Sequence, residues 1–318
     1  MNQETLFPFY VRRGASPDEY KAGYINCEGR TVIDAHFQDA TSFRDDLASV
    51  RLNDRWGVIN SYGTVLIPCV YSEALRFCEG RAHFYGASGL VGVLSDDGSV
   101  VLPPKYRTIS DYNDSLAYVW NGETFGFIDL MGAVVIPPFF EEARQFVDGL
   151  APVQSGGKWG YIDKGASFII PPKFDSARSY SEGLARVNID GSWGYIDRKG
   201  EYVIPPRYGN CMDFRESLAP AAIAKRGPLG YIDKTGAFVI SPKYGFANYF
   251  SEGLAAASPP NETRFRFLTK TGSQAFEGEF LGAGDFEHGR CLVSTMETIA
   301  YIDPNGNIIW QGPYVTRV

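Results

Sequence analysis

One short pattern, an aromatic or apolar residue followed by glycine, recurs along the chain at an almost constant interval. The clearest copies are WGYIDKG at 159–165, WGYIDRKG at 193–200 and LGYIDKTG at 229–236. The second position of the copies holds, in chain order, Gly23, Gly57, Gly92, Gly126, Gly160, Gly194, Gly230, Arg266 and Ala300. Neighbouring positions differ by 34 to 36 residues. The chain is therefore about nine copies of one unit, which predicts a repeat architecture.

A single copy, residues 174–206, predicts short strands separated by turns. Alternating side chains predict strands over 184–188 and 193–197, with a tight turn after Asp197. Residues 202–204 predict a third strand, which we expect Pro205-Pro206 to end because proline donates no hydrogen bond to a sheet.

The strand over 193–197 carries the recurring Gly and its flanking aromatics. Side chains alternate along a strand, so Trp193 and Tyr195 face one way while Gly194 and Ile196 face the other. Glycine weakens a strand, so we expect a neighbouring unit to approach Gly194 closely. The recurring aromatic would then cover the next sheet, with Trp193 buried between units.

These motifs resemble the WG-repeat (KWG-repeat) family of bacterial proteins. The resemblance rests on KWGYID at 158–163, SWGYID at 192–197, and the Phe/Tyr-x-x-Gly-Leu-Ala turns at 146–151, 180–185 and 250–255. It covers nearly the whole chain and is strongest over about 110–256. The family implies an all-β repeat domain without implying a reaction, and some of its members resemble partners or immunity factors in bacterial toxin systems.

Units of three or four short strands stack either as an open β-superhelix or as a closed β-propeller. Nine units exceed the usual number of propeller blades, and about 34 residues is short for a four-stranded blade. We therefore favour an open or imperfectly closed β-superhelix as a single domain over 1–318, with degenerate capping repeats at about 1–35 and 265–318. The alternative is a closed propeller, in which the lead-in at 174–180 supplies an inner strand.

The sequence offers no pattern that supports a catalytic, metal or cofactor site. His36, His83 and His288 lack the spacing of metal ligands, and Gly282-Ala283-Gly284 does not join a strand to a helix as a dinucleotide site requires. The Asp-x-x-Gly turns bring one acid each, whereas calcium takes six to eight oxygen ligands. We therefore expect turn caps, no cofactor and no enzyme.

Charge and hydropathy restrict the partners and the location of the chain. A net charge of −7, without a basic stripe, argues against nucleic-acid binding and would suit a basic protein partner. No apolar run reaches about 18 residues and the first residues do not resemble a signal peptide, so neither a membrane span nor secretion is expected. The five cysteines form no CxxC pair, which favours reduced thiols in a cytoplasmic protein.

Departures from the repeat consensus are where a partner is expected to bind. The loops at 12–21, 222–228 and 258–264 are long and share one place in the unit, so we expect them on one rim. Neutral variation of surface loops is the alternative, and for Trp120 the alternative is packing against Phe125. The candidate partner-binding residues are Trp120, Lys225, Arg226, Asn261, Glu262 and Arg264.

The first hypothesis is a non-catalytic protein-binding scaffold, as an immunity or adaptor protein whose partner is a basic toxin or effector. The alternative is a carbohydrate or small-molecule binding protein, or an enzyme, with a central site in a closed propeller. A structural spacer with an even surface is the third.

Overall fold

The computed structural model describes residues 5–12 and 20–313, which form strands, turns and irregular segments without any helix. Residues 140–146, the segment whose sequence comes nearest to a short helix, form strand residues and irregular backbone instead. Packing divides the chain into two compact units, the first ending at Phe146 and the second beginning at Val147. Nine antiparallel sheets occur in the described residues, which matches the nine copies.

The first unit contains the sheets β1-β2-β3, β4-β5-β6-β7, β10-β9-β8 and β11-β12-β13-β14. Its strands are β1 (Leu6–Arg12), β2 (Tyr20–Asn26), β3 (Thr31–Phe37), β4 (Asp39–Ala40), β5 (Leu47–Leu52), β6 (Arg55–Asn60), β7 (Val65–Tyr71), β8 (Arg81–Tyr85), β9 (Val91–Ser95), β10 (Val100–Tyr106), β11 (Thr108–Ile109), β12 (Leu116–Trp120), β13 (Phe125–Asp129), β14 (Val134–Phe140) and β15 (Glu142–Ala143).

The second unit begins with β16, β17 and β18 of one sheet and continues with β19-β20-β21-β22, β23-β24-β25-β26, β27-β28-β29 and β30-β31-β32-β33. Its strands are β16 (Ala151–Ser155), β17 (Lys158–Ile162), β18 (Phe168–Phe174), β19 (Ser176–Ala177), β20 (Ala185–Ile189), β21 (Ser192–Ile196), β22 (Tyr202–Tyr208), β23 (Asn210–Cys211), β24 (Ala219–Ala222), β25 (Leu229–Ile232), β26 (Phe238–Tyr244), β27 (Phe246–Ala247), β28 (Leu254–Ser258), β29 (Arg266–Thr269), β30 (Gly282–Ala283), β31 (Cys291–Ser294), β32 (Thr298–Ile302) and β33 (Ile308–Pro313).

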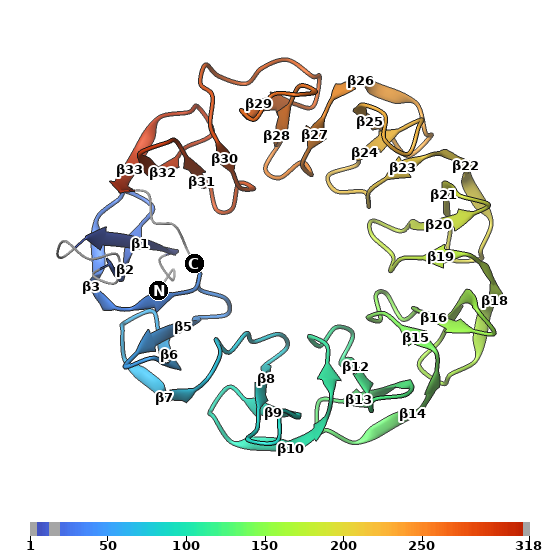
Figure 1. Cartoon of the computed structure of the whole chain (residues 1–318), viewed down its shortest axis with the longest axis horizontal. Helices are drawn as coiled ribbons and strands as arrows, with labels where there is room; N and C mark the ends of the chain where they lie inside the picture. The colour runs from blue at the N-terminus through green and yellow to red at the C-terminus, as the bar shows by residue number, and fades with distance from the viewer. Residues whose placement is uncertain (1–4, 13–19, 314–318) are drawn as a thin grey trace. The chain divides into compact units, whose positions relative to one another are not determined.

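The lead-in of each complete copy is a strand of only two residues, such as β19, which pairs with β20. Each complete copy is therefore a four-stranded antiparallel meander, the blade of a propeller. In the second unit these short strands lie on the concave side of an arc and the fourth strands on its convex side (Figure 1). The sheets fit the propeller alternative rather than the favoured superhelix, because a two-residue inner strand lets about 34 residues complete a blade.

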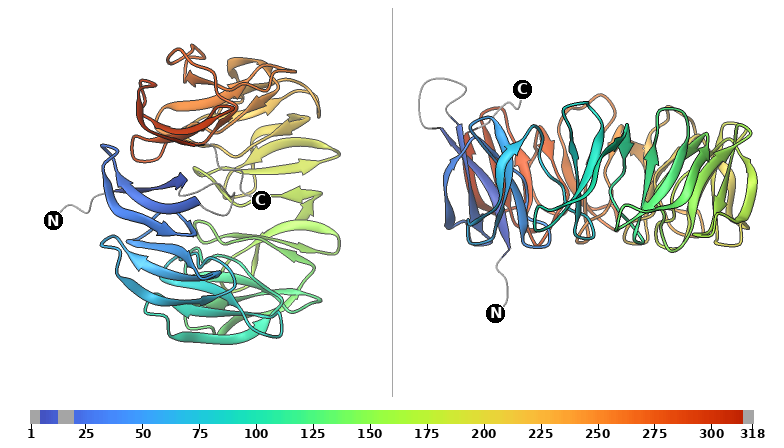
Figure 2. Two further views of the ribbon diagram at one scale, coloured as in Figure 1. Left: turned by 60° about the vertical axis from the view of Figure 1, so that its left-hand side comes forward. Right: turned by 90° about the horizontal axis from the view of Figure 1, so that it is seen from below.

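Strand ends and turns gather at two opposite edges of the sheets (Figure 2). One edge carries the loops between second and third strands. The other carries the Asp-x-x-Gly turns, where Asp197 Oδ1 accepts hydrogen bonds from the amides of Lys199 and Glu201 at 2.9 and 3.0 Å, and Gly200 has φ of +82°. The interpretation of these aspartates as turn caps is confirmed.

The recurring glycine is required by the adjacent strand of its own sheet, and not by a neighbouring repeat. A Cβ on Gly194 would lie 2.5 Å from Ile204 O and 2.7 Å from Pro206 N, both on β22. The register shifts at this point, so β22 bulges over the glycine. The prolines therefore lie inside β22 instead of ending it, which an edge strand permits because its outward amides need no partner.

Both faces of β21, the third of the four strands in its blade, are buried against neighbouring sheets. Tyr195, 1% exposed, packs with Phe214 and Ala219 of the following sheet, whereas Ile196 packs with Tyr161 and other residues of the preceding one. Trp193 is only half-buried, and the Arg186 guanidinium lies 5.4 Å from its ring centroid. The alternation of faces is confirmed, but the aromatic buried between sheets is the tyrosine.

Candidate partner-binding rim

Two of the three long loops belong to neighbouring sheets of the second unit. Residues 222–228 connect β24 to β25, and residues 258–264 connect β28 to β29. Each joins a second to a third strand, so both emerge at the same edge of their sheets. We call this surface, residues 222–228 and 258–264, the loop rim. Of the third long loop, residues 13–19 lie outside the described part of the chain.

The loop at 222–228 folds over the connection that precedes its sheet. Gly209 N donates to Ile223 O at 2.8 Å, and a Cβ on Gly209 would lie 2.2 Å from Lys225 N. Lys225 and Arg226 are exposed, and neither side chain forms a hydrogen bond or ion pair within the described residues. The two cations are therefore available to an acidic group of a partner.

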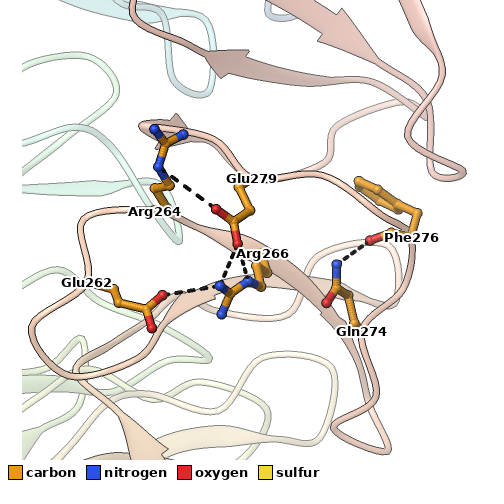
Figure 3. A network of polar contacts seen from close by, with 6 residues as sticks. All are labelled: Glu262, Arg264, Arg266, Gln274, Phe276 and Glu279. Carbon is orange, nitrogen blue, oxygen red and sulfur yellow. Dashed lines mark hydrogen bonds and ion pairs between the residues drawn. The ribbon is translucent and has the colours of Figure 1, made fainter.

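The loop at 258–264 is held by a network of charged side chains (Figure 3). Arg266 Nε donates to Glu279 Oε1 at 2.9 Å, and the Arg266 guanidinium also lies 3.3 Å from Glu262 Oε2. Arg264 Nε lies 3.9 Å from the second oxygen of Glu279. The hydrogen bond to Glu279 raises the pKa of Arg266. Glu262 and Arg264 thus help fix the shape of the loop, and exposed Asn261 takes φ of +65° near its tip.

Arg266 and Glu279 were missed as site residues by the sequence reasoning. Arg266 was visible as a departure, because it occupies the place of the recurring glycine. Its role could not be read, because Glu279 lies 13 residues further along in a segment that forms no regular strand.

Trp120 belongs to the first unit, at the end of β12. Its ring stacks on Phe125 with centroids 6.1 Å apart and an interplanar angle of 22°. Trp120 therefore packs against Phe125 as the alternative interpretation expected, and its role in partner binding stays a prediction.

The histidines and cysteines do not assemble into a reactive centre within the described residues. His83 Nδ1 lies 3.8 Å from Asp111 Oδ1, and no group of three or more His, Cys, Asp or Glu side chains is placed to hold a metal ion there. All five cysteines are free, and burial raises the pKa of Cys211 to about 11 and of Cys291 to about 12. Such thiols are poor nucleophiles.

The membrane prediction can be compared only with the helices. In the part of the chain that the structure describes, no helix has the length and hydropathy of a membrane span.

The repeated sequence that folds into these blades matches a known family model. The model for the WG containing repeat matches residues 23–56, 56–83, 92–122, 125–159, 159–193, 193–223 and 230–258. The chain belongs to the WG-repeat family. No curated protein matches this WG-repeat protein.

Solved structures similar to the WG-repeat protein establish its fold alone. The crystal structure of the eukaryotic initiation factor aligns with a TM-score of 0.70 and 12% identity, covering 99% of this chain and 97% of the other. The computationally designed Ika8 protein aligns with a TM-score of 0.50 and 12% identity, covering 86% of this chain and 95% of the other.

Proposed function

We propose that the WG-repeat protein is a non-catalytic binding scaffold that holds a protein partner on the loop rim. The observation that carries this proposal is the contrast between uniform blades and two irregular loops on adjacent sheets. The complete blades share one order of strand pairing, so these longer loops set their two places on this edge apart.

The chemistry of the loop rim suits an acidic patch on the partner. Lys225 and Arg226 are exposed and form no ion pair in the part of the chain that the structure describes, whereas Arg264 and Arg266 are balanced by Glu262 and Glu279. The loop at 258–264 therefore gives the partner a surface of fixed shape, and Lys225 and Arg226 provide the positive charge. An immunity or adaptor role, with a basic toxin or effector that carries such an acidic patch as partner, is the narrower form of this proposal.

The test is capture of partners from the native host by the wild-type protein and by two variants. One variant carries Lys225→Glu and Arg226→Glu, and the other has 222–228 and 258–264 replaced by the short Asp190-Gly191 turn of β20–β21. Both should lose the captured partner. Lys199→Glu, on an exposed turn at the opposite edge, is the matched control and should retain it. Undiminished capture by both variants would rule out the loop rim.

We also propose that the nine blades close into one propeller. The four-stranded meander supports this arrangement, because it is the blade from which propellers are built. Sheet β1-β2-β3 has no short inner strand among its described residues, and a closed ring would bring another part of the chain to that edge.

A further inference from the structure

A pocket of about 230 Å³ opens in the first unit, between the sheet of β4–β7 and the sheet of β8–β10. Its walls come from residues 41–49 and from 74–77, the segment that leads into β8. Two of the nine lining residues are arginines, three carry hydroxyl groups and none is acidic. The pocket is therefore cationic although the whole chain has a net charge of −7.

Ser49, which lines the pocket, is much shorter than the residue at the same place in the sixth copy of the repeat. In the sixth copy this place holds Arg186, whose Nε lies 2.7 Å from Asp213 Oδ1 and whose guanidinium donates to Cys211 O. The Ser49 side chain ends at Oγ, which donates to Leu75 O at 2.6 Å. The long side chain that fills the space between two sheets in the sixth copy is thus replaced by a short one in the second copy.

A second departure from the repeat, at Val58 of the same copy, affects which side chain donates to the Leu75 carbonyl. Tyr195 donates to Met212 O at 2.6 Å, but the corresponding residue here is Val58, which cannot donate. Leu75 O, the counterpart of Met212 O, is instead satisfied by Ser49. The exchange opens the pocket without leaving a buried carbonyl unpaired.

Arg44 and Arg76 line this pocket, and neither forms an ion pair with an acid among the described residues. Both are exposed, and neither side chain makes a hydrogen bond or ion pair within the described residues. Burial and the Asp111 carboxylate raise the pKa of Cys78, and the charges of both arginines oppose that rise, so the two cations and one carboxylate outside the pocket wall lie near the same sulfur. In the seventh copy the place of Arg76 is taken by Asp213, so the charge at this place is reversed.

We propose that this pocket binds the oxyanion of a small ligand, a phosphate or carboxylate attached to a short apolar body. Two guanidinium groups beside serine and threonine hydroxyls recognise such oxyanions. Leu47, Leu75 and Phe77 form the apolar part of the wall. The volume is smaller than that of a typical drug-sized site, which restricts the ligand to few non-hydrogen atoms.

Calorimetric titration with phenyl phosphate, benzoate and benzylamine tests the proposal. Phenyl phosphate or benzoate should bind, and the stronger of the two identifies the oxyanion. Benzylamine, which has a similar body and the opposite charge, should not bind. Arg44→Gln combined with Arg76→Gln should weaken binding at least tenfold. Arg55→Gln, at an exposed hairpin outside the pocket, should leave it unchanged.

A second variant tests the shape of the pocket. Ser49→Arg introduces the side chain found at the equivalent place in the sixth copy and should abolish binding. If that variant fails to fold, the double arginine variant still decides. Absence of binding by both anions at millimolar concentration, or binding unchanged in the double arginine variant, would overturn the proposal.

Discussion

At the scale of single residues, buried tyrosine hydroxyls join three sheets of the second unit to the sheets that follow them. Tyr161 donates to Arg178 O at 2.8 Å, Tyr195 to Met212 O at 2.6 Å and Tyr231 to Asn248 O at 2.7 Å, always 17 residues further along. Each acceptor lies beside a two-residue strand, which is too short to satisfy its own backbone. The hydroxyl thus fastens the irregular inner part of the following blade.

Replacing Tyr195 by phenylalanine tests this role. The ring still fills its place, but Met212 O loses its donor, so the free energy of unfolding should fall by about 1–2 kcal/mol. Urea denaturation measures the loss. Tyr202→Phe, at a side chain 41% exposed, is the control and should change little. Equal stability of the two variants would show that the hydroxyl bond does not hold the blades together.

The local roles of residues were more predictable from the sequence than their contacts with other strands. The repeat made Gly194 and Asp197 stand out, and the turn-cap role of Asp197 follows from local geometry. The reason for Gly194 did not follow, because the bulge of β22 depends on pairing between strands. For the same reason the sequence favoured Trp193 over Tyr195 as the ring buried between sheets.

At the scale of elements, the turns before the second strands form a ladder from blade to blade. Glu216 Oε2 accepts from Gly253 N at 2.9 Å and lies 3.0 Å from Lys270 Nζ. Glu182 repeats the pattern with Ser217 N at 3.0 Å. Burial tends to raise the pKa of Glu216, but Lys270 and the Gly253 amide outweigh it, so the pKa is lowered from 4.5.

This lowered pKa gives a prediction about pH. Because the folded form holds the Glu216 proton less tightly than the unfolded form, its stabilisation is present above about pH 4.5 and disappears as pH falls through the folded pKa. Glu216→Gln should cost about 0.5–1 kcal/mol at pH 7 and much less at about pH 3. Urea denaturation at both pH values measures this. A cost that is the same at both would contradict the role of the charge.

Element boundaries also explain where the repeat degenerates. In the last two copies Arg266 and Ala300 replace the glycine. β29 has no regular fourth strand beside it, and Ala300 pairs with Gln311 without a bulge at that point. Glycine is thus kept where a bulge lies over it and is lost where none does. The sequence showed the degeneracy but not this cause.

At the scale of the whole molecule, the number of sheets was predictable from the sequence, whereas the choice between a closed ring and an open superhelix was not. Closure depends on the angle between neighbouring sheets and on inner strands of two residues, which carry no detectable pattern. Small-angle X-ray scattering tests the proposed ring. A closed propeller should give a radius of gyration close to the about 20 Å of a compact chain of this length. An open superhelix would give a distinctly larger value.

The place of the loop rim was predictable because a loop's position in the unit decides the edge at which it emerges. Its internal network was not, since Glu279 reaches Arg266 from outside the regular strands. The sequence therefore predicted the candidate surface but not the contacts that shape its second loop.

Hydrogen exchange of the WG-repeat protein, alone and with its captured partner, tests the binding scaffold most directly. The account predicts that the partner slows exchange at 222–228 and 258–264, while the inner strands β19, β23 and β27 exchange as before. Slowed exchange at the inner strands, with both loops unaffected, would contradict the account and favour a central ligand site.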